Sequence, residues 1–337
     1  MPTPKSLFRH SDAMKPTVLA TGYSLAGYLI GGYWMLSDHW GWNLLGVLWF
    51  AHSMVIAAYL VHDAAHLNVF QNKRHNRWYG EFLLWITGCS YSDFNDIAHK
   101  HARHHSDRAD IVSVDFRPVL KRHPRVLKTL QVLEWAYIPA LEILMHALVI
   151  ILPFVKQNRR HRRVRVVSVL IVRLALFAYL ATLSLNFLWL YALSYLLFLT
   201  FMRFMDVHQH TYEVYETLDQ KRGPESRLRD KHFEEHNTYS NLFSVKYPWV
   251  NLIALNFSYH NVHHRQQMQP WYRLPELHQE LYGDQDQQVL TFRHLIKSFH
   301  KYRVPRIING DPVNLSAKKD EGESFIGVDG VSFLTAH

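Results

Sequence analysis

The chain has 337 residues, of which 48% are hydrophobic and 14% aromatic, yet its mean hydropathy is −0.15. Long apolar runs alternate with very polar runs, a pattern typical of polytopic membrane proteins with a soluble cap and not of small soluble domains. The net charge of +9 is concentrated in residues 156–165, between two apolar runs, which favours a membrane-flanking basic loop over a nucleic-acid footprint. The single cysteine, Cys89, excludes an intrachain disulfide and an iron–sulfur site held by this chain.

Two apolar runs near the N-terminus predict a first pair of membrane-spanning helices. They cover about 17–36 and 42–60, after a polar and basic start that ends at Lys15. The first run is too long for the core of a signal peptide. The short connection between the runs has no Lys or Arg and is flanked by tryptophans, which are common at membrane interfaces. We therefore expect a helical hairpin whose second helix leads directly to His62.

Three further apolar runs lie at about 133–155, 166–184 and 187–205. The histidine clusters before and after them can share one face of the membrane only if an even number of these runs crosses it. The run 133–155 contains Glu134 and Glu142, and a charge at mid-membrane costs about 2.5–3.5 kcal/mol on insertion scales. We expect this run to be interfacial or re-entrant and the other two to form a second hairpin.

The expected fold class is therefore all-α: a polytopic membrane protein with four transmembrane helices in two hairpins and a cytoplasmic helical cap. Both termini and all histidine clusters are expected on the cytoplasmic side, because the basic loop should be cytoplasmic. Arg173, within the third span, is expected to extend to the interface. Residues 1–308 are expected to form a single membrane-embedded domain, and residues 309–337 an irregular polar tail.

Three histidine clusters carry the chemistry: His62 and His66 in an HxxxH motif, and HxxHH motifs at 101–105 and 260–264. Neutral imidazole is the commonest nitrogen ligand of transition metals, and positions i, i+3 and i+4 share one face of a helix. Eight histidines are too many for one tetrahedral ion but sufficient for two metals. The single cysteine disfavours structural zinc, and the absence of an HExxH motif disfavours a zincin-type protease. Imidazole-rich sites with open positions suit iron that must bind oxygen.

In this order, with paired spans before the first and last clusters, the motifs resemble the membrane-bound fatty acid desaturase and hydroxylase family, over about residues 17–300. Gln209-His210-Thr211 resembles the additional histidine of this family after the fourth span. The stretch after His264, with Pro270 and Leu274-Pro-Glu-Leu277, is similar to the sequence that follows the last histidine motif of the family, and residues 235–240 resemble a segment of bacterial members. The resemblance implies nine iron ligands: His62, His66, His101, His104, His105, His210, His260, His263 and His264.

Several polar residues close in sequence to these ligands could support them. Asp63 and Asn261 could orient ligand imidazoles through their second nitrogen atoms. Asp206 lies one helical turn before the additional histidine and could hold a water on one iron. His99 and His236 could also lie behind the ligands. For each of these residues the alternative is an ordinary structural or solvent-exposed role.

The resemblance implies an enzyme that uses two iron ions, with O2 as co-substrate, to remove hydrogen from an acyl chain held in a narrow apolar tunnel. Electrons are expected from an external ferredoxin- or cytochrome-like donor with its reductase, because the chain shows no flavin fingerprint, no haem-binding domain and too few cysteines for a cluster. The expected partners are therefore a fatty acid or fatty acyl substrate, the electron donor and the lipid bilayer, with no nucleic acid. The expected location is a bacterial inner membrane.

The reaction itself remains open among several alternatives. A fatty acid desaturase is the leading interpretation. Oxidative decarboxylation of a free fatty acid to a terminal 1-alkene is a close alternative, and it would require a cation near the site, with Lys100, Arg103 or Arg265 as candidates. These cations could instead contact lipid phosphates or be solvated. A fatty acyl hydroxylase is a third alternative. A metal-dependent membrane hydrolase or a non-catalytic metal-binding membrane protein would need neither O2 nor a reductant.

Overall fold

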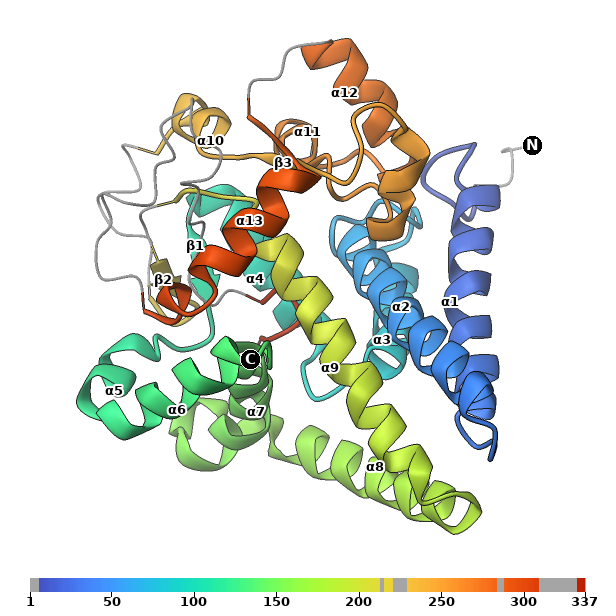
Figure 1. The fold of residues 1–337 in the computed structure, drawn as a ribbon. Helices are drawn as coiled ribbons and strands as arrows, with labels where there is room; N and C mark the ends of the chain where they lie inside the picture. The colour runs from blue at the N-terminus through green and yellow to red at the C-terminus, as the bar shows by residue number, and fades with distance from the viewer. Residues whose placement is uncertain (1–5, 213–214, 221–228, 284–287, 309–331, 337) are drawn as a thin grey trace. The chain divides into compact units, whose positions relative to one another are not determined.

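The structure of the chain is a computed structural model that describes residues 6–212, 215–220, 229–283, 288–308 and 332–336. It is mostly helical, as the sequence predicts, with a few short strands (Figure 1). The chain divides into two compact units. The first comprises the described residues of Met1–Ile97 and His146–Phe201, and the second those of Ala98–Met145 and Met202–Ala336.

Long helices make up most of the first unit. Its elements are α1 (Met14–Trp34), α2 (Trp40–Ala65), α3 (Lys73–Ile86), η1 (Gln157–Arg162), α8 (Arg163–Leu183) and most of α9 (Asn186–Asp206). The backbones of α1 and α2 approach closely at two glycines, since a Cβ atom on Gly46 would lie 2.7 Å from the carbonyl oxygen of Gly31. Small residues at such a crossing allow two apolar helices to pack tightly. The first predicted hairpin is therefore present.

Among the described residues, three helical stretches are long and apolar enough to cross a membrane: Trp40–Ala65, Gln157–Leu183 and Asn186–Asp206. They coincide with the second, third and fourth predicted spans. α1 contains the first predicted span but is not in this group, because Gly, Ser, Thr and Tyr interrupt its apolar residues. α8 and α9 form the second predicted hairpin (Figure 1).

Arg173 in α8 does not extend to an interface, contrary to the prediction. Its side chain is buried, and its Nη2 atom donates to the carbonyl oxygen of Trp85 and to the hydroxyl of Ser90, each at 3.1 Å. The guanidinium also lies 5.2 Å from the centre of the Trp85 ring. The end of α3 thus supplies the polar and aromatic partners of this charge, so it does not need to reach the surface.

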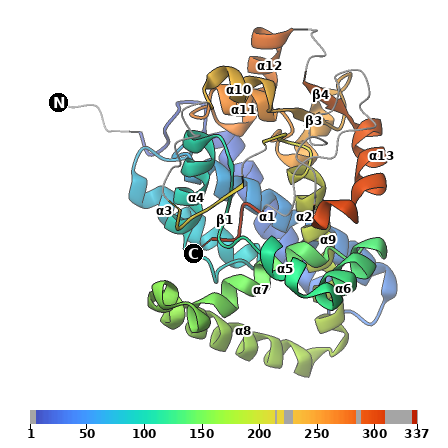
Figure 2. The same cartoon turned by 90° about the vertical axis from the view of Figure 1, so that its left-hand side faces the viewer.

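The second unit consists of shorter elements. They are α4 (Phe94–Asp107), β1 (Asp110–Val112), α5 (Arg117–Arg122), α6 (Pro124–Trp135), α7 (Ala140–Val155), β2 (Tyr215–Thr217), α10 (Lys231–His236), β3 (Ser240–Leu242), η3 (Pro248–Ala254), α11 (His260–Arg265), η4 (Trp271–Arg273), α12 (Leu274–Tyr282), β4 (Val289–Thr291), α13 (Phe292–Tyr302) and η5 (Pro305–Ile307). Of these, α4 and α7 also contribute residues to the first unit. The helices α5, α6 and α7 lie beside one another (Figure 2). One apolar core joins them around Phe116, Leu130 and Leu141.

Two pairs of parallel strands bring distant parts of the second unit together. β1, which follows α4, pairs with β2, and Asp110 lies opposite Tyr215. β3, which precedes α11, pairs with β4, and Ser240 lies opposite Val289. The first pair fixes the end of α4 against the chain that follows α9, so histidines on these two segments can lie close together.

The run predicted as an interfacial or re-entrant segment, 133–155, is not one continuous helix. It divides into the end of α6 and the whole of α7, because the backbone turns at Tyr137, with φ of 62°, and Pro139 follows. The carboxylate of Glu134 accepts a hydrogen bond from the backbone N–H of Leu141 at 3.0 Å, which stabilises this turn. The interfacial position of α7 stays a prediction.

The last residues described, Ser332–Ala336, form no helix or strand, as expected for the irregular tail, but they are not solvent-exposed. Ser332–Ala336 is largely buried, and Leu334 is only 2% exposed. The Lys100 ammonium group donates to the carbonyl oxygens of Ser332 and Thr335, the latter at 2.8 Å. This segment is held in the interior because it supplies acceptors to a buried charge. The rest of the predicted tail, residues 309–331, lies outside the described residues.

Candidate metal centre

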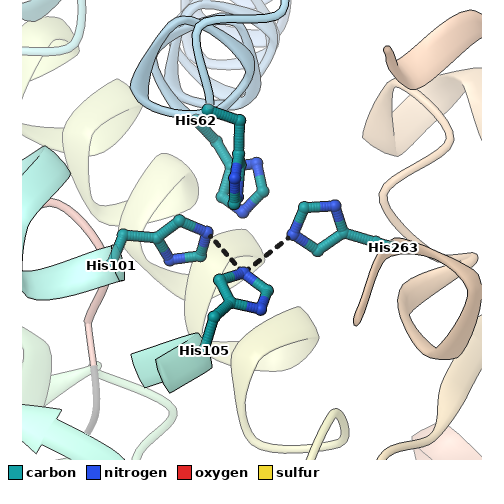
Figure 3. Close-up of side chains that lie close together, drawn as sticks. His62, His101, His105 and His263 are labelled. Carbon is teal, nitrogen blue, oxygen red and sulfur yellow. Dashed lines mark hydrogen bonds between the residues drawn. The ribbon is translucent and has the colours of Figure 1, made fainter. Parts of the chain in front are cut away.

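The first histidine group consists of His101 and His105 on α4 and His263 on α11. His101 and His105 lie one helical turn apart, so they share a face of α4. The Nε2 atom of His105 lies 3.0 Å from Nε2 of His101 and 3.1 Å from Nε2 of His263 (Figure 3). All three residues are buried.

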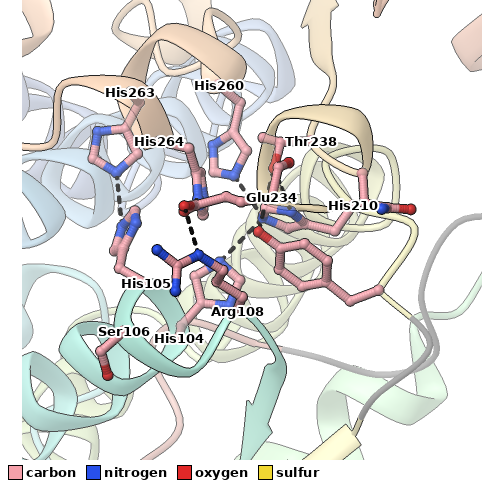
Figure 4. Close-up of polar contacts among 12 residues, drawn as sticks. His104, His105, Ser106, Arg108, His210, Glu234, Thr238, His260, His263 and His264 are labelled. Carbon is pink, nitrogen blue, oxygen red and sulfur yellow. Dashed lines mark hydrogen bonds and ion pairs between the residues drawn. The ribbon is translucent and has the colours of Figure 1, made fainter. Parts of the chain in front are cut away.

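The second histidine group consists of His104 on α4, His210 after the end of α9, and His260 and His264 on α11. The Nε2 atom of His210 lies 3.1 Å from Nε2 of His104 and 2.8 Å from Nε2 of His260 (Figure 4). One ring nitrogen from each of the four residues lies within 4.8 Å of the others. The second unit therefore brings together seven of the nine predicted ligands, in two groups.

These distances fit metal coordination better than hydrogen bonding among the rings. A neutral imidazole nitrogen carries at most one hydrogen, yet Nε2 of His210 and Nε2 of His105 each face two other ring nitrogens. Ligand nitrogens at about 2.0–2.1 Å from one ion and at right angles to each other are separated by about 3 Å. In addition, Nε2 of His264 is buried and has no hydrogen-bond partner among the described residues. Each group can thus hold one metal ion.

In the second group, other residues hold the ring nitrogens that face away from the cluster. The Nδ1 atom of His104 donates to the carbonyl oxygen of Ala109 at 2.8 Å. His264 Nδ1 lies 2.9 Å from the Glu234 carboxylate, and His210 Nδ1 lies 3.5 Å from the hydroxyl of Thr238. A hydrogen on Nδ1 leaves the lone pair of Nε2 available to a metal. These contacts therefore favour the tautomer of each ring that can bind a metal through Nε2.

The protonation state of the second group also suits a metal site. Burial lowers the pKa of His104 to about 4, and it lowers the pKa of His210 and His264 well below the usual value for histidine. The neighbouring imidazoles act in the same direction on His210 and His264, because a second positive charge is disfavoured there. The three rings are therefore neutral at pH 7, which is the form that binds metal ions.

Comparison with known proteins now identifies the family. A family model described as fatty acid desaturase matches residues 39–296, which include every predicted iron ligand. The chain belongs to this family. No curated protein and no solved structure matches it. The family is iron-dependent and acts on fatty acyl chains, so the chain is an oxidoreductase with fatty acyl substrates, and its buried imidazole groups fit a metal site. The family and the three apolar helices together indicate a membrane protein.

His62 and His66, the remaining predicted ligands, lie in the first unit at the end of α2. Their ring centres are 4.9 Å apart, as expected for residues one helical turn apart, and His62 is buried. The pair can therefore present two imidazoles in one direction. Their role as ligands stays a prediction.

The supporting residues expected from sequence proximity have other contacts in the structure. The carboxamide oxygen of Asn261 accepts a hydrogen bond from the Ser240 hydroxyl, and the Asp63 carboxylate accepts one from Asn68 at 3.3 Å. Asp206 is half-buried, lies near the charge of Lys100 and accepts a hydrogen bond from the backbone of Phe333. These contacts support structural roles, and the ligand-orienting roles stay predictions.

The two additional histidines proposed as supporting groups are exposed. His99 lies on the solvent-facing side of α4, and His236 lies at the end of α10. The Nδ1 atom of His236 donates to the backbone carbonyl of His232 at 2.7 Å, which is a local helical contact. Exposure favours the solvated alternative for both residues.

The most informative residue that the sequence did not reveal is Glu234 on α10. One carboxylate oxygen contacts His264 and the other lies 3.1 Å from Nε of Arg108. Thirty residues separate Glu234 from His264, so sequence proximity gave no reason to connect them. The one available signal is Asp230, whose side chain accepts from the backbone N–H of Phe233 and thereby marks the start of α10.

The three cations considered for a substrate carboxylate differ in their surroundings. Lys100 is bound to the carbonyls of Ser332 and Thr335, as described above. Arg103 forms ion pairs with Asp107 at 2.8 Å and Glu216 at 3.1 Å and also donates to two backbone carbonyls. Arg265 remains partly exposed, with a 44% exposed side chain. Lys100 and Arg103 therefore have structural partners already.

A cavity of about 740 Å³ opens beside the second histidine group. It is lined by Arg108, Glu234 and His264, and on its outer side by Glu235, Arg265 and the glutamines that follow. All of these residues belong to the second unit. Glu234 and His264 therefore both line a cavity large enough to hold small polar molecules.

Proposed function

We propose that the chain is an O2-dependent di-iron oxidase that introduces a double bond into a fatty acyl chain. One iron is held by the second histidine group. The other is held by the first histidine group together with His62 and His66. The observation that carries this proposal is the presence of two separate clusters of buried ring nitrogens, each with contacts of 2.8–3.1 Å, in a chain of the desaturase family.

When bound, the iron pair would supply the activation of O2 and the removal of hydrogen from a C–H bond. The residues of the chain have three tasks in this reaction. The imidazoles stay neutral because they are buried, and so remain available as ligands. Ala109, Thr238 and Glu234 hold the distal nitrogens and fix the ring orientations. Burial of both groups keeps bulk water away from the reacting acyl carbon.

The proposed membrane topology has four spans, with α1 as the fourth in addition to the three apolar stretches. α1 packs against α2 over its length as a helix of 21 residues, sufficient to cross a bilayer of about 30 Å. The basic residues 156–165 support a cytoplasmic location for the start of α8. Because an even number of spans then separates the clusters, we propose that both termini and all ligands lie on the cytoplasmic side of a bacterial inner membrane.

Electrons are proposed to come from a separate ferredoxin- or cytochrome-like donor with an acidic surface. Arg108, Lys231 and Arg265 line the cavity beside His264 and favour such a partner. Turnover should then fall steeply as the ionic strength rises, because the Debye length shortens from about 10 Å at 0.1 M salt to about 3 Å at 1 M. A reaction rate independent of salt would argue against this donor.

The proposal is tested by feeding a saturated fatty acid or its thioester to the purified protein with iron, a reductant and O2. We expect about two iron ions per chain and an internal olefin of unchanged chain length, identified by gas chromatography. A shortened 1-alkene would instead assign the decarboxylation considered above, and a hydroxy acid would assign a hydroxylase. Product formation under strictly anaerobic conditions would remove the oxidase assignment, because a hydrolase needs neither O2 nor a reductant.

A further inference from the structure

The contact between Glu234 and His264 differs from an ordinary surface ion pair. His264 is 4% exposed and Glu234 is 6% exposed, and the distance from Nδ1 to Oε1 is 2.9 Å. The second carboxylate oxygen is taken by Nε of Arg108 at 3.1 Å. Both oxygens therefore have a partner, and one of these partners is the ring nitrogen of His264, so the carboxylate is arranged to support this imidazole.

Arg108 is itself fixed in position. Its Nη1 atom donates to the carbonyl oxygen of Arg229 at 3.1 Å, and Arg229 in turn pairs with Glu216 at 2.8 Å. Arg108 also has a positive φ of 50°, so the chain turns sharply directly after α4 and directs this side chain towards α10. The end of α4 therefore supplies both a ligand, His104, and the cation that holds the carboxylate behind another ligand.

We propose that Glu234 is a positioning residue for the reaction. By accepting the Nδ1 hydrogen of His264, it presents Nε2 of that ring to the metal of the second histidine group. Arg108 holds Glu234 in place from the cavity side. This inference rests on the proposed function. A carboxylate behind a ligand imidazole fixes the tautomer and raises the basicity of the ring, and loss of such a partner weakens metal binding by about 10–100-fold.

The cavity allows an experiment whose result would differ if the role of Glu234 were purely structural. Truncating Glu234 enlarges the cavity of about 740 Å³ that His264 also lines, so a small carboxylate from solution can occupy the place of the missing side chain beside this ring. We expect metal-free E234A to bind Co²⁺ about 10–100-fold more weakly than the wild type at the second group. Added formate or acetate should restore most of this affinity, whereas chloride at equal ionic strength should not. The absorption spectrum of bound Co²⁺ reports the binding without any turnover.

The matched control is Glu235→Ala. Glu235 is the neighbouring carboxylate on the same cavity, but it is exposed and lies 4.0 Å from Arg265. E235A should bind Co²⁺ like the wild type and show no response to formate. A second variant, Glu234→Gln, keeps the shape and an acceptor oxygen, so it should fold even if E234A does not, and it should bind Co²⁺ with intermediate affinity.

The outcomes separate this inference from the proposed function. If the wild type binds two Co²⁺ ions and both Glu234 variants bind them equally well, the positioning role is refuted while the metal centre stands. If E234A binds weakly but formate gives no recovery in the folded protein, Glu234 acts only through the structure and the inference also fails. If the wild type binds no Co²⁺ or Fe²⁺ at all, the proposed function itself fails.

Discussion

The two histidine groups of the second unit have different surroundings. In the second group, Ala109, Thr238 and Glu234 contact the outward nitrogens of three rings. In the first group, aromatic rings lie against the imidazoles: Phe333 packs edge-on against His101 at 5.1 Å, and Phe257 against His263 at 5.9 Å. Aromatic packing also reaches the second group, where Tyr212 stacks on His210 at 4.3 Å, and what distinguishes this group is the set of polar contacts to three of its rings.

This difference indicates unequal metal sites. The second group has four imidazoles within one compact unit, three of them already oriented, so little order has to be gained when a metal binds. The first group has three imidazoles from the same unit and, in the proposed function, depends on His62 and His66 for completion. We therefore expect the second group to bind its metal more tightly than the first.

The largest effect should follow from removing a ligand of the second histidine group, which is the better ordered site. His264→Ala should abolish turnover and lower bound iron towards about one ion per chain, because it removes a ligand and leaves the Glu234 carboxylate without its imidazole partner. Iron content by mass spectrometry and product formation by gas chromatography measure both effects. His300→Ala, an exposed histidine on α13, should change neither quantity. If H264A and H300A behave alike, the ligand assignment is incorrect.

Loss of His62 should also abolish turnover but affect only the weaker site. H62A should retain about one iron per chain, bound as tightly as the tighter ion of the wild type, because the second group is complete without it. Titration of the metal-free protein with Fe²⁺ under anaerobic conditions resolves the two affinities. Loss of the tight site in H62A, with the weak site unchanged, would reverse the proposed assignment of His62.

A moderate effect is expected from removing residues 332–337, which include the ring that packs against His101. Lys100 would lose the carbonyl acceptors of Ser332 and Thr335, and an unsatisfied buried charged donor costs about 3 kcal/mol or more. The truncated protein should unfold several degrees lower in a thermal melt in detergent, with weaker metal binding at the first group only. An unchanged melting temperature would mean that this segment does not hold Lys100 in solution.

The smallest effect concerns pH. Burial lowers the pKa of His104 to about 4, so the second group should keep its metal as the pH falls from 7 to 5 and lose it only near pH 4. The metal-free protein should become less stable over the same range, because below pH 6.5 the unfolded chain binds a proton that folded His104 does not. Metal retention after dialysis at stepped pH measures this. Half-loss of the tightly bound metal at pH 6–6.5 would indicate an ordinary, solvent-accessible imidazole.

Much of the architecture could be read from local sequence. The HxxxH and HxxHH spacings predict shared helix faces, and α2, α4 and α11 carry these motifs as expected. Long apolar runs predicted α2, α8 and α9, because apolar length is a property of consecutive residues. The division of 133–155 was not predictable from hydropathy alone, since the turn at Tyr137 depends on Glu134 capping the next helix.

The sequence by itself determined the family, the helical content and the identity of the imidazoles, because ligand type and helical spacing are local properties of the chain. Only the tertiary structure decided how seven imidazoles divide into two groups and that Glu234 and Arg108 lie behind one of them. It also decided that Ser332–Ala336 is buried against Lys100. These contacts join residues 30 to 235 positions apart, and no local pattern specifies such a pairing until the packing of the whole unit brings the partners together.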